Sequence, residues 1–421
     1  MQIYLDSIGC RLNWSEVEML ARQLIATGHS VVSRPDEADV IVVNTCAVTA
    51  QAERKTRHTI RSLHRDNPSA QLAVIGCCAT LKPEALASLQ GVAWVIPNAD
   101  KDQTADAVTG IKQPSPTSEE TLSKAGMLRT RGFVKVQDGC DNHCTYCIIR
   151  SLRGPSHSRP VGDIIAELQA LTEEADCREA VLTGASLGAY GRDLGPNSVN
   201  LRTLVETVLA DTDLSRLRLS SIEPWDLDET FFELWDNPRL CRQIHLPLQA
   251  GCDATLRRMG RPITTEAFAN LVRAARRAIP GVAVTTDVLV GFPGEDKEAY
   301  RASYAFVKEM TFAKLHVFPY SSRPSTPATR LPGQVPHEVR DERAQQMREL
   351  GAEQRHRFQT RFLNRELDVL WEKQWKDGRW TGWTDNYIRV VARAEEDLCN
   401  RITPVVLRTL RKGYLEGEVL T

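Results

Sequence analysis

Three cysteines lie close together in the stretch GCDNHCTYCIIRSLRG. Cys140, Cys144 and Cys147 have the spacing C-x3-C-x2-C, and the apolar segment FVKVQ comes just before them. Thiolates at this spacing suit an iron-sulfur cluster, and three ligands would leave one iron of a four-iron cluster open to a small molecule. A zinc site is the alternative, with Asp141 or His143 as the fourth ligand. Both interpretations place a metal-binding loop at the end of a strand.

The rest of the sequence indicates that these thiols are reduced. The N-terminus, MQIYLDSIGC, has no basic segment followed by an apolar one, so we expect no signal peptide. No apolar run approaches the roughly 20 residues of a membrane-spanning helix. We therefore expect a cytoplasmic protein with no membrane association, whose clustered cysteines are ligands rather than disulfides. The formal net charge is -1, so any binding of nucleic acid must come from local patches.

Short apolar segments alternate with helical periods at the start of the chain. Residues 2–5, 39–44 and 71–76 read as strands, and the last two are apolar throughout, as in a parallel sheet covered on both faces. A helix is expected from about Ser15. These features predict a doubly wound α/β domain over residues 1–112. The Pro- and Ser-rich text IKQPSPTSEE predicts a linker, which we assign to residues 113–129.

The alternation resumes at residue 130 with the strand candidates FVKVQ, EAVLTG, LRLSS, QIHLPL, VAVTTDVLVG and FAKLHVF. These β/α units predict a partial, TIM-like (β/α)6 barrel over residues 130–358, with its site at the carboxyl ends of the strands. An open doubly wound sheet is the alternative. Residues 359–421 are β-like and predict a small antiparallel β-barrel, a fold that often binds nucleic acid. The fold class as a whole is α/β.

A second group of cysteines belongs to the first domain. Cys10, Cys46 and Cys77 each follow an expected strand, and the carboxyl ends of parallel strands meet at one edge of a sheet. They could converge on a second cluster, although a lone cysteine is more often a small core residue. Cys78 adjoins Cys77 and could compete with it as a ligand.

Basic residues recur at helical spacing after Cys46. On a helix they would form one stripe, which is suited to binding phosphate groups without reading sequence. An ordinary solvated helix face is the alternative. The residues of this basic stripe are Arg54, Arg57, His58, Arg61 and Arg65.

At GCDNHCTYC the sequence resembles the radical S-adenosylmethionine (SAM) enzymes. Nearly the whole chain closely resembles the methylthiotransferase family among them. That likeness is carried, in order, by SIGCRLNWSE, NTCAVTAQAERKTR, VIGCCAT, LTGASLGAYGRD, RLSSIEP, HLPLQAG, TDVLVGFPGE and HVFPYSSRPSTPA. The segment GWTDNYIRV resembles the signature of the TRAM domain, the family's C-terminal β-barrel. The resemblance implies an N-terminal domain with an auxiliary cluster, a radical-SAM barrel and a TRAM domain.

The resemblance also implies two 4Fe-4S clusters and SAM as cofactors. Cys140, Cys144 and Cys147 would hold the catalytic cluster, whose open iron binds SAM and whose reduction splits it to a radical. An auxiliary cluster would present a sulfur atom for methylation, and the radical would activate the C2–H bond of an adenine. The family's third cysteine motif, G-C-x-A, implies Cys77 rather than Cys78 as a ligand of that cluster, beside Cys10 and Cys46. The positions expected to contact SAM are Tyr146, Thr183, Gly184, Ser221, Glu223 and Gln249.

The text NTCAVTAQAERKTR and the Asp-Asn pair after Cys140 look most like the branch that acts on N6-threonylcarbamoyladenosine at position 37 of tRNA. The expected partners are that tRNA anticodon loop and a flavodoxin-like or ferredoxin-like reductant, whereas the sulfur donor is not indicated. The alternatives are the isopentenyl-adenosine tRNA branch and the branch that modifies an aspartate of a ribosomal protein. A more remote one is an iron-sulfur RNA-binding redox sensor without turnover.

Overall fold

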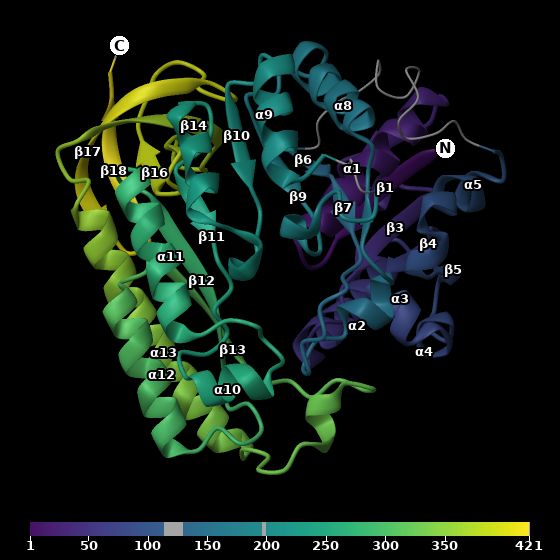
Figure 1. Cartoon of the computed structure of the whole chain (residues 1–421). Helices are drawn as coiled ribbons and strands as arrows, with labels where there is room; N and C mark the ends of the chain where they lie inside the picture. The colour runs from purple at the N-terminus through teal and green to yellow at the C-terminus, as the bar shows by residue number, and fades with distance from the viewer. Residues whose placement is uncertain (113–128, 196–198, 421) are drawn as a thin grey trace.

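The computed structural model describes residues 1–112, 129–195 and 199–420 (Figure 1). All of the expected linker except Arg129 lies outside these residues. In the described part of the chain, no helix is long and apolar enough to cross a membrane.

The first domain is a doubly wound parallel sheet, as predicted. Its strands β1 (Gln2–Ser7), β2 (Ser30–Val32), β3 (Val40–Thr45), β4 (Gln71–Gly76) and β5 (Val92–Ile96) lie in the order β2-β1-β3-β4-β5. Separate apolar clusters cover the two faces of the sheet. In such a sheet the strand order reverses between β1 and β3, where ligands commonly bind.

The helices of this domain are short except for two. They are α1 (Arg11–Ala26), α2 (Ala50–Asp66), α3 (Cys77–Leu81), α4 (Pro83–Ala87) and α5 (Thr104–Thr109), with 3-10 turns at Pro35–Glu37 and Asn98–Gln103. Helix α1 begins one turn earlier than the expected start near Ser15, because buried Leu12 already belongs to its apolar face.

The second domain is a partial barrel of parallel strands, as predicted. The strands β6 (Arg131–Lys135), β9 (Glu179–Thr183) and β10 (Arg216–Leu219) form one sheet, and β11 (Gln243–His245), β12 (Ala283–Val290) and β13 (Lys314–Pro319) form the other. Isolated parallel bridges, such as Ser221 to His245, join β10 to β11. The strands therefore follow one another around the barrel in sequence order.

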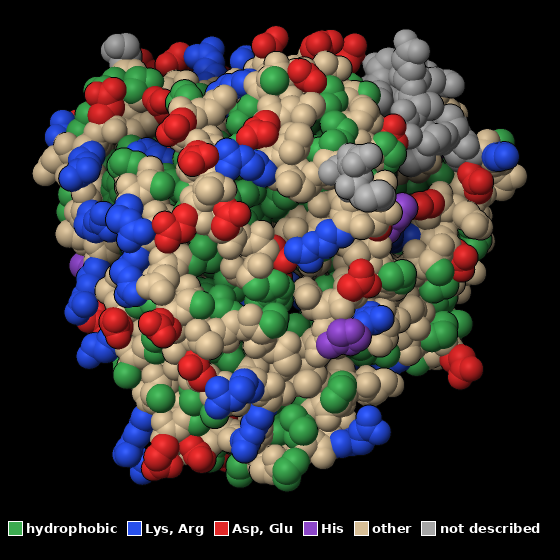
Figure 2. All heavy atoms as spheres, in the orientation of Figure 1, with side chains coloured by type: hydrophobic (Ala, Val, Ile, Leu, Met, Phe, Trp, Pro, Cys, Tyr) green, Lys and Arg blue, Asp and Glu red, His purple; other side chains and the backbone are tan. Residues whose placement is uncertain are grey.

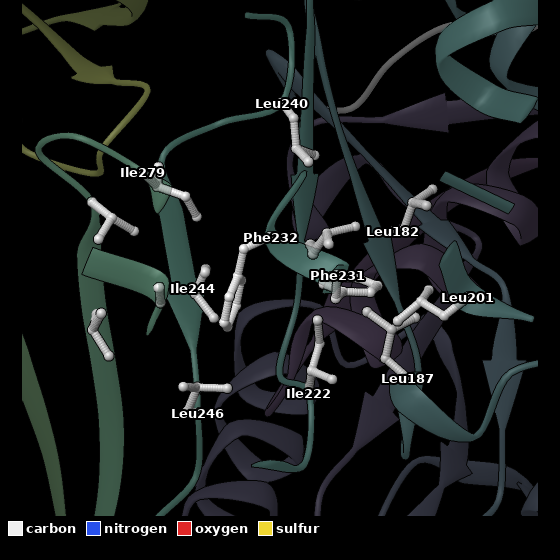
Figure 3. Close-up of a cluster of buried hydrophobic side chains, with 14 of the residues drawn as sticks. Leu182, Leu187, Leu201, Ile222, Phe231, Phe232, Leu240, Ile244, Leu246 and Ile279 are labelled. Carbon is white, nitrogen blue, oxygen red and sulfur yellow. The ribbon is translucent and has the colours of Figure 1, made fainter. Parts of the chain in front are cut away.

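Helices cover the outside of this barrel (Figure 1). They are α8 (Val161–Glu173), α9 (Leu201–Asp211), α10 (Asp253–Arg258), α11 (Thr265–Ala278), α12 (Lys297–Met310) and α13 (His337–Thr360). The 3-10 turns lie at Leu187–Ala189, Pro224–Asp226, Glu229–Asp236 and Pro327–Arg330. The main apolar core packs between the strands and this layer, with Leu182, Phe232 and Ile244 near its centre (Figure 3).

The third domain is a closed β-barrel of β14 (Glu366–Gln374), β15 (Trp380–Thr384), β16 (Arg389–Ala392), β17 (Ile402–Arg411) and β18 (Tyr414–Val419). Its described strand pairs are antiparallel, as expected, except that β16 and β18 are parallel. This barrel contacts the second domain through Arg131, whose Nε lies 2.8 Å from Oε1 of Glu372. The first domain contacts the second through α1, where Arg22 forms a buried ion pair with Glu167.

Candidate active site

The loop carrying Cys140, Cys144 and Cys147 lies between β7 (Gln137–Asp138) and α7 (Ile149–Arg153), at the carboxyl end of β6. Strand β7 pairs with β8 (His157–Ser158). The backbone N–H of Cys140 donates to the carbonyl of Gly154 at 3.1 Å, and that of Cys147 donates to the carbonyl of Cys144 at 3.1 Å. These bonds hold the loop in a compact turn.

A glycine makes this turn possible. Gly139 has a φ of +69°, and a Cβ atom there would lie 1.8 Å from the carbonyl oxygen of Pro155. Any side chain would therefore push the start of the loop away from its end, because a backbone oxygen cannot yield to it.

The three thiols of the loop lie close enough to affect one another. Burial, together with the charges of Cys144 and Cys140, raises the pKa of Cys147 to about 12. Neutral thiols are therefore favoured while nothing binds them. A cationic cluster would reverse that preference, because metal binding stabilises thiolates. The donor set and its mutual repulsion fit an iron-sulfur cluster.

Two of the expected SAM contacts, Tyr146 and Glu223, lie beside this loop. The charge of Glu223 raises the pKa of each of the three cysteines. Glu223 Oε2 lies 2.7 Å from Nη2 of Arg261, and the hydroxyl of Tyr146 lies 3.5 Å from Nη1 of the same arginine. No sequence motif marks Arg261, so it was not among the expected contacts. Its side chain is buried, and its Nε has no hydrogen-bond partner among the described residues.

The other four expected SAM contacts have surroundings that differ from those of Tyr146 and Glu223. Thr183 is buried, and its carbonyl accepts a hydrogen bond from Val136 at 2.9 Å, just before the cysteine loop. A Cβ atom at Gly184 would lie 2.8 Å from Oε1 of Gln137, so this glycine allows close packing against that side chain. Ser221 is exposed at the end of β10. Gln249 adopts a φ of +73°, and its N–H donates to the carbonyl of Asp287 at 2.9 Å.

The second group of cysteines is brought together by the first sheet. Cys10, Cys46 and Cys77 follow the adjacent strands β1, β3 and β4. Burial, together with the charges of Cys10 and Cys77, raises the pKa of Cys46 to about 12. Gly9 allows the close approach, because it has a φ of +122° and a Cβ there would lie 2.7 Å from the Cβ of Cys46. Three converging thiols are again suited to a cluster.

Cys77 and Cys78 differ in their surroundings. Nδ2 of Asn98 lies 3.5 Å from Sγ of Cys77, and the charge of Cys77 raises the pKa of Cys10. The backbone N–H of Cys78 donates to Oγ1 of Thr45, and burial raises the pKa of its thiol, which the charges of Lys82 and Arg57 lower and that of Cys77 raises. The arrangement favours Cys77 as the partner of Cys10 and Cys46.

A buried charge network lies between the two cysteine groups. Arg153, on the helix directly after the first loop, donates from Nη1 to Glu16 at 2.9 Å and to Asp138 at 2.8 Å. Lys101 also pairs with Glu16, and Nζ of Lys135 lies 3.8 Å from it. Although burial raises the pKa of Glu16, these cations hold it well below its usual range. Sequence analysis missed this network, because its members are far apart along the chain.

The basic stripe lies on α2, where every one of its residues is exposed while Ile60 and Leu63 are buried. Thr49 caps this helix by accepting a hydrogen bond from the N–H of Ala52 at 3.1 Å. On the face of the molecule in Figure 2, acidic and basic side chains are interspersed, as the net charge of -1 leads one to expect. The stripe is thus a local feature beside Cys46.

Comparisons with known proteins agree with this architecture. Residues 2–96 match the model of the uncharacterized protein family UPF0004, and residues 134–307 match the radical SAM superfamily. The radical SAM methyltransferase TsrM from Kitasatospora setae, solved with cobalamin and a 4Fe-4S cluster, has a similar fold. Its TM-score is 0.57 at 16% identity, over 78% of this chain and 76% of that one.

Two curated relatives match almost end to end. One is the threonylcarbamoyladenosine tRNA methylthiotransferase MtaB of Bacillus subtilis, 34% identical over 98% of this chain and 95% of that protein. The other is a tRNA-2-methylthio-N(6)-dimethylallyladenosine synthase of Sulfurihydrogenibium sp., 29% identical over 100% of this chain and 99% of that protein. The chain therefore belongs to the radical-SAM methylthiotransferase family of enzymes.

Proposed function

We propose that this enzyme replaces the C2 hydrogen of N6-threonylcarbamoyladenosine, at position 37 of tRNA, with a methylthio group. The observation that carries the proposal is the pair of cysteine groups, each at the carboxyl ends of parallel strands and joined by the buried network around Arg153. The choice of branch is supported by relatives named for threonylcarbamoyladenosine, which reach 34% identity, whereas the dimethylallyladenosine relatives reach 32%.

Cys140, Cys144 and Cys147 would hold a 4Fe-4S cluster with one open iron for SAM. When bound and reduced, this cluster supplies the electron that splits SAM and so provides the hydrogen-abstracting radical. Arg261 and Glu223 are suited to orient SAM, because a buried guanidinium whose Nε has no partner among the described residues and a partly buried carboxylate can serve its polar groups. Tyr146 packs edge-on against Phe292 at 6.4 Å and would close this side of the site. Thr183, Gly184, Ser221 and Gln249 would shape the rest of the pocket.

Cys10, Cys46 and Cys77 would hold the auxiliary cluster, which presents the sulfur to be methylated and transferred. A hydrogen bond from the backbone of Asn13 favours the thiolate of Cys10, and Oδ1 of Asn13 accepts from Arg153 at 2.8 Å, so Asn13 would fix Cys10 relative to the other loop. The buried charge network would keep the two clusters at a constant separation, because each of its ion pairs is costly to break once water is excluded.

The RNA would be held mainly by phosphate contacts to the basic stripe, since its cations are exposed and lie on the helix that follows Cys46. In the C-terminal barrel, the rings of Trp383 and Tyr387 stack at a centroid distance of 4.8 Å. The guanidinium of Arg131, which belongs to the second domain, lies over both rings. The side chain of Arg131 is only 12% exposed and pairs with Glu372, so this stack secures the small barrel against the second domain, and the RNA contacts rest on the basic stripe. We also expect a flavodoxin-like or ferredoxin-like reductant.

Mass spectrometry of nucleosides tests the proposal. The gene would be expressed in a host that makes N6-threonylcarbamoyladenosine but not its methylthio form, and total tRNA would be digested. We expect a new nucleoside in which a methylthio group replaces one hydrogen, and we expect it to vanish in C140A and C77A. The exposed Cys399 provides the matched control, since C399A leaves both cysteine groups intact.

The proposal fails if the wild-type enzyme, with both clusters loaded, leaves N6-threonylcarbamoyladenosine unchanged. A methylthio group on an isopentenyl-type nucleoside, or on a ribosomal protein, would instead assign the chain to another branch of the family.

A further inference from the structure

Strand β13 presents a row of polar and aromatic side chains to the interior of the barrel. Leu315 and Val317 pack against the main apolar core on the helix-covered side. Successive side chains of a strand point to opposite faces, so Lys314, His316 and Phe318 face the interior. Because a strand rises about 3.3 Å per residue, the row extends about 13 Å from Phe318, near the carboxyl end, to Lys314.

Lys314 is a partly buried cation without a counterion. Its ammonium forms no hydrogen bond or ion pair with the described residues. Burial lowers its pKa, and the positive charges of Arg355 and Arg11 lower it further, whereas Tyr387 raises it. Placing cations together in a partly buried position is unfavourable unless an anion joins them. The deep end of the row is therefore suited to a negatively charged group.

His316 is held in place by Asp287. Nδ1 of His316 lies 3.4 Å from Oδ1 of Asp287, and the same oxygen lies 3.3 Å from Nε2 of His245. Nδ1 of His245 in turn contacts Oγ1 of Thr285 at 2.9 Å. The second ring nitrogen of His316 has no hydrogen-bond partner in the described part of the chain, and 39% of the side chain is exposed. An oriented polar group is thus available beside Lys314.

The outer end of the row is apolar and lies nearest the cofactor site. Phe318 is 43% exposed, which is unusual for a large apolar side chain, and its ring could stack on a base. The row connects to the expected SAM contacts through Asp287. Burial raises the pKa of Glu223, and the charge of Asp287 acts in the same direction; the backbone carbonyl of Asp287 accepts the hydrogen bond from Gln249.

We propose that Phe318, His316 and Lys314 form the subsite for the substrate adenosine, with the base on Phe318 and a carboxylate-bearing N6 substituent reaching His316 and Lys314. This inference rests on the proposed function and deepens it, because it names the groups that would read the threonyl carboxylate. C2 and C6 are separated only by N1 on one edge of the adenine ring, but their outward bonds diverge, so C2 would face the clusters while the N6 substituent points along the row into the barrel. An isopentenyl group would leave Lys314 and His316 desolvated without a partner, which a binding site penalises strongly.

Binding measurements with the full-length, cluster-loaded enzyme test this subsite. The probes are anticodon stem-loops that carry N6-threonylcarbamoyladenosine, N6-methylcarbamoyladenosine or adenosine at position 37. The methylcarbamoyl probe keeps the urea linkage but lacks the carboxylate. We expect the wild type to bind the threonylcarbamoyl loop about tenfold or more tightly than the methylcarbamoyl loop, the loss typical of one charge-assisted hydrogen bond.

K314M and H316Q should bring this ratio close to one, and an iron content equal to that of the wild type shows that the variants fold and load their clusters. K308M is the matched control, because Lys308 is exposed on α12, outside the barrel. It should keep the wild-type ratio.

Three results would overturn the subsite. The first is a wild-type ratio of threonylcarbamoyl to methylcarbamoyl affinity near one, and the second is a ratio that K314M and H316Q leave unchanged. The third is the binding of one zinc ion per chain that the D287N substitution abolishes. The last is a competing occupant, because the ligand atoms of His245, Asp287 and His316 all lie within 4.8 Å of one another. The proposed function is judged separately by nucleoside mass spectrometry. Selective, Lys314-dependent binding without a methylthio product would support the subsite and reject the reaction.

Discussion

Nη2 of Arg153 donates a hydrogen bond to Oδ1 of Asn13 at 2.8 Å, although the two residues belong to different domains. Asn13 lies on α1, three residues after Cys10, and Arg153 lies at the end of α7, six residues after Cys147. This contact couples the positions of the two cysteine groups. We therefore expect a substitution of either residue to shift the cysteine groups of both domains.

R153M should destabilise the protein by about 3 kcal/mol, because it leaves the carboxylates of Glu16 and Asp138 buried with fewer cations. Chemical denaturation of the apo-protein measures the change. R61M is the control, since Arg61 is exposed on α2 and should change the unfolding free energy by less than about 0.5 kcal/mol. Equal stabilities of R153M and wild type would show that the network does not hold the domains together.

G139A should prevent the first cysteine loop from closing, because the added Cβ would meet the carbonyl oxygen of Pro155. After anaerobic reconstitution, we expect the iron content to fall from about eight to about four atoms per chain, as one 4Fe-4S cluster is lost. G162A is the control, because a Cβ at Gly162 on α8 meets nothing within 4 Å. Full iron loading of G139A would contradict the geometry.

The adjacent cysteines of the third motif should behave differently. C77A should lose about four iron atoms per chain, whereas C78A should retain both clusters, because only Cys77 acts electrostatically on both Cys10 and Cys46. Iron analysis together with electron paramagnetic resonance of the reduced protein distinguishes the clusters. The reverse pattern would make Cys78 the ligand.

Neutralising the basic stripe should weaken tRNA binding without changing base preference. For R57Q and R61Q we expect the slope of log affinity against log salt to fall by about one for each residue. R301Q is the control, since Arg301 is exposed on α12. An unchanged salt slope for the double variant would identify α2 as an ordinary solvated face.

Glu18 should make stability depend on pH. Burial raises the pKa of this carboxyl to about 7, while its Oε2 accepts a hydrogen bond from the N–H of Phe133 at 3.2 Å. A raised folded pKa means that the contribution of Glu18 is complete below pH 4.5 and is lost as the pH rises through 7. Relative to E18Q, which does not titrate, the wild type should therefore lose about 3 kcal/mol of unfolding free energy over this range. A constant difference between the two proteins would show that Glu18 does not titrate there.

The sequence alone predicted the features that depend on local order along the chain. Apolar runs without alternation are typical of parallel strands, and the cysteines that follow them had to reach one edge of the sheet. Cys10, Cys46 and Cys77 could therefore be grouped by their positions along the chain. The helical spacing of the basic stripe likewise predicted that its residues share one face of α2, and in the structure Ile60 and Leu63 are buried away from that face.

Tertiary structure decided the contacts between residues that are far apart in sequence. Arg261 reaches Glu223, and Arg153 reaches Glu16, only because the chain folds back on itself, and no spacing rule links such pairs. The parallel pairing of β16 with β18 arises in the same way, from closure of the small barrel. The interior row on β13 is an intermediate case. Alternation predicts that Lys314, His316 and Phe318 share a face, but only packing against the helices shows that this face lines the barrel, because Leu315 and Val317 occupy the apolar side.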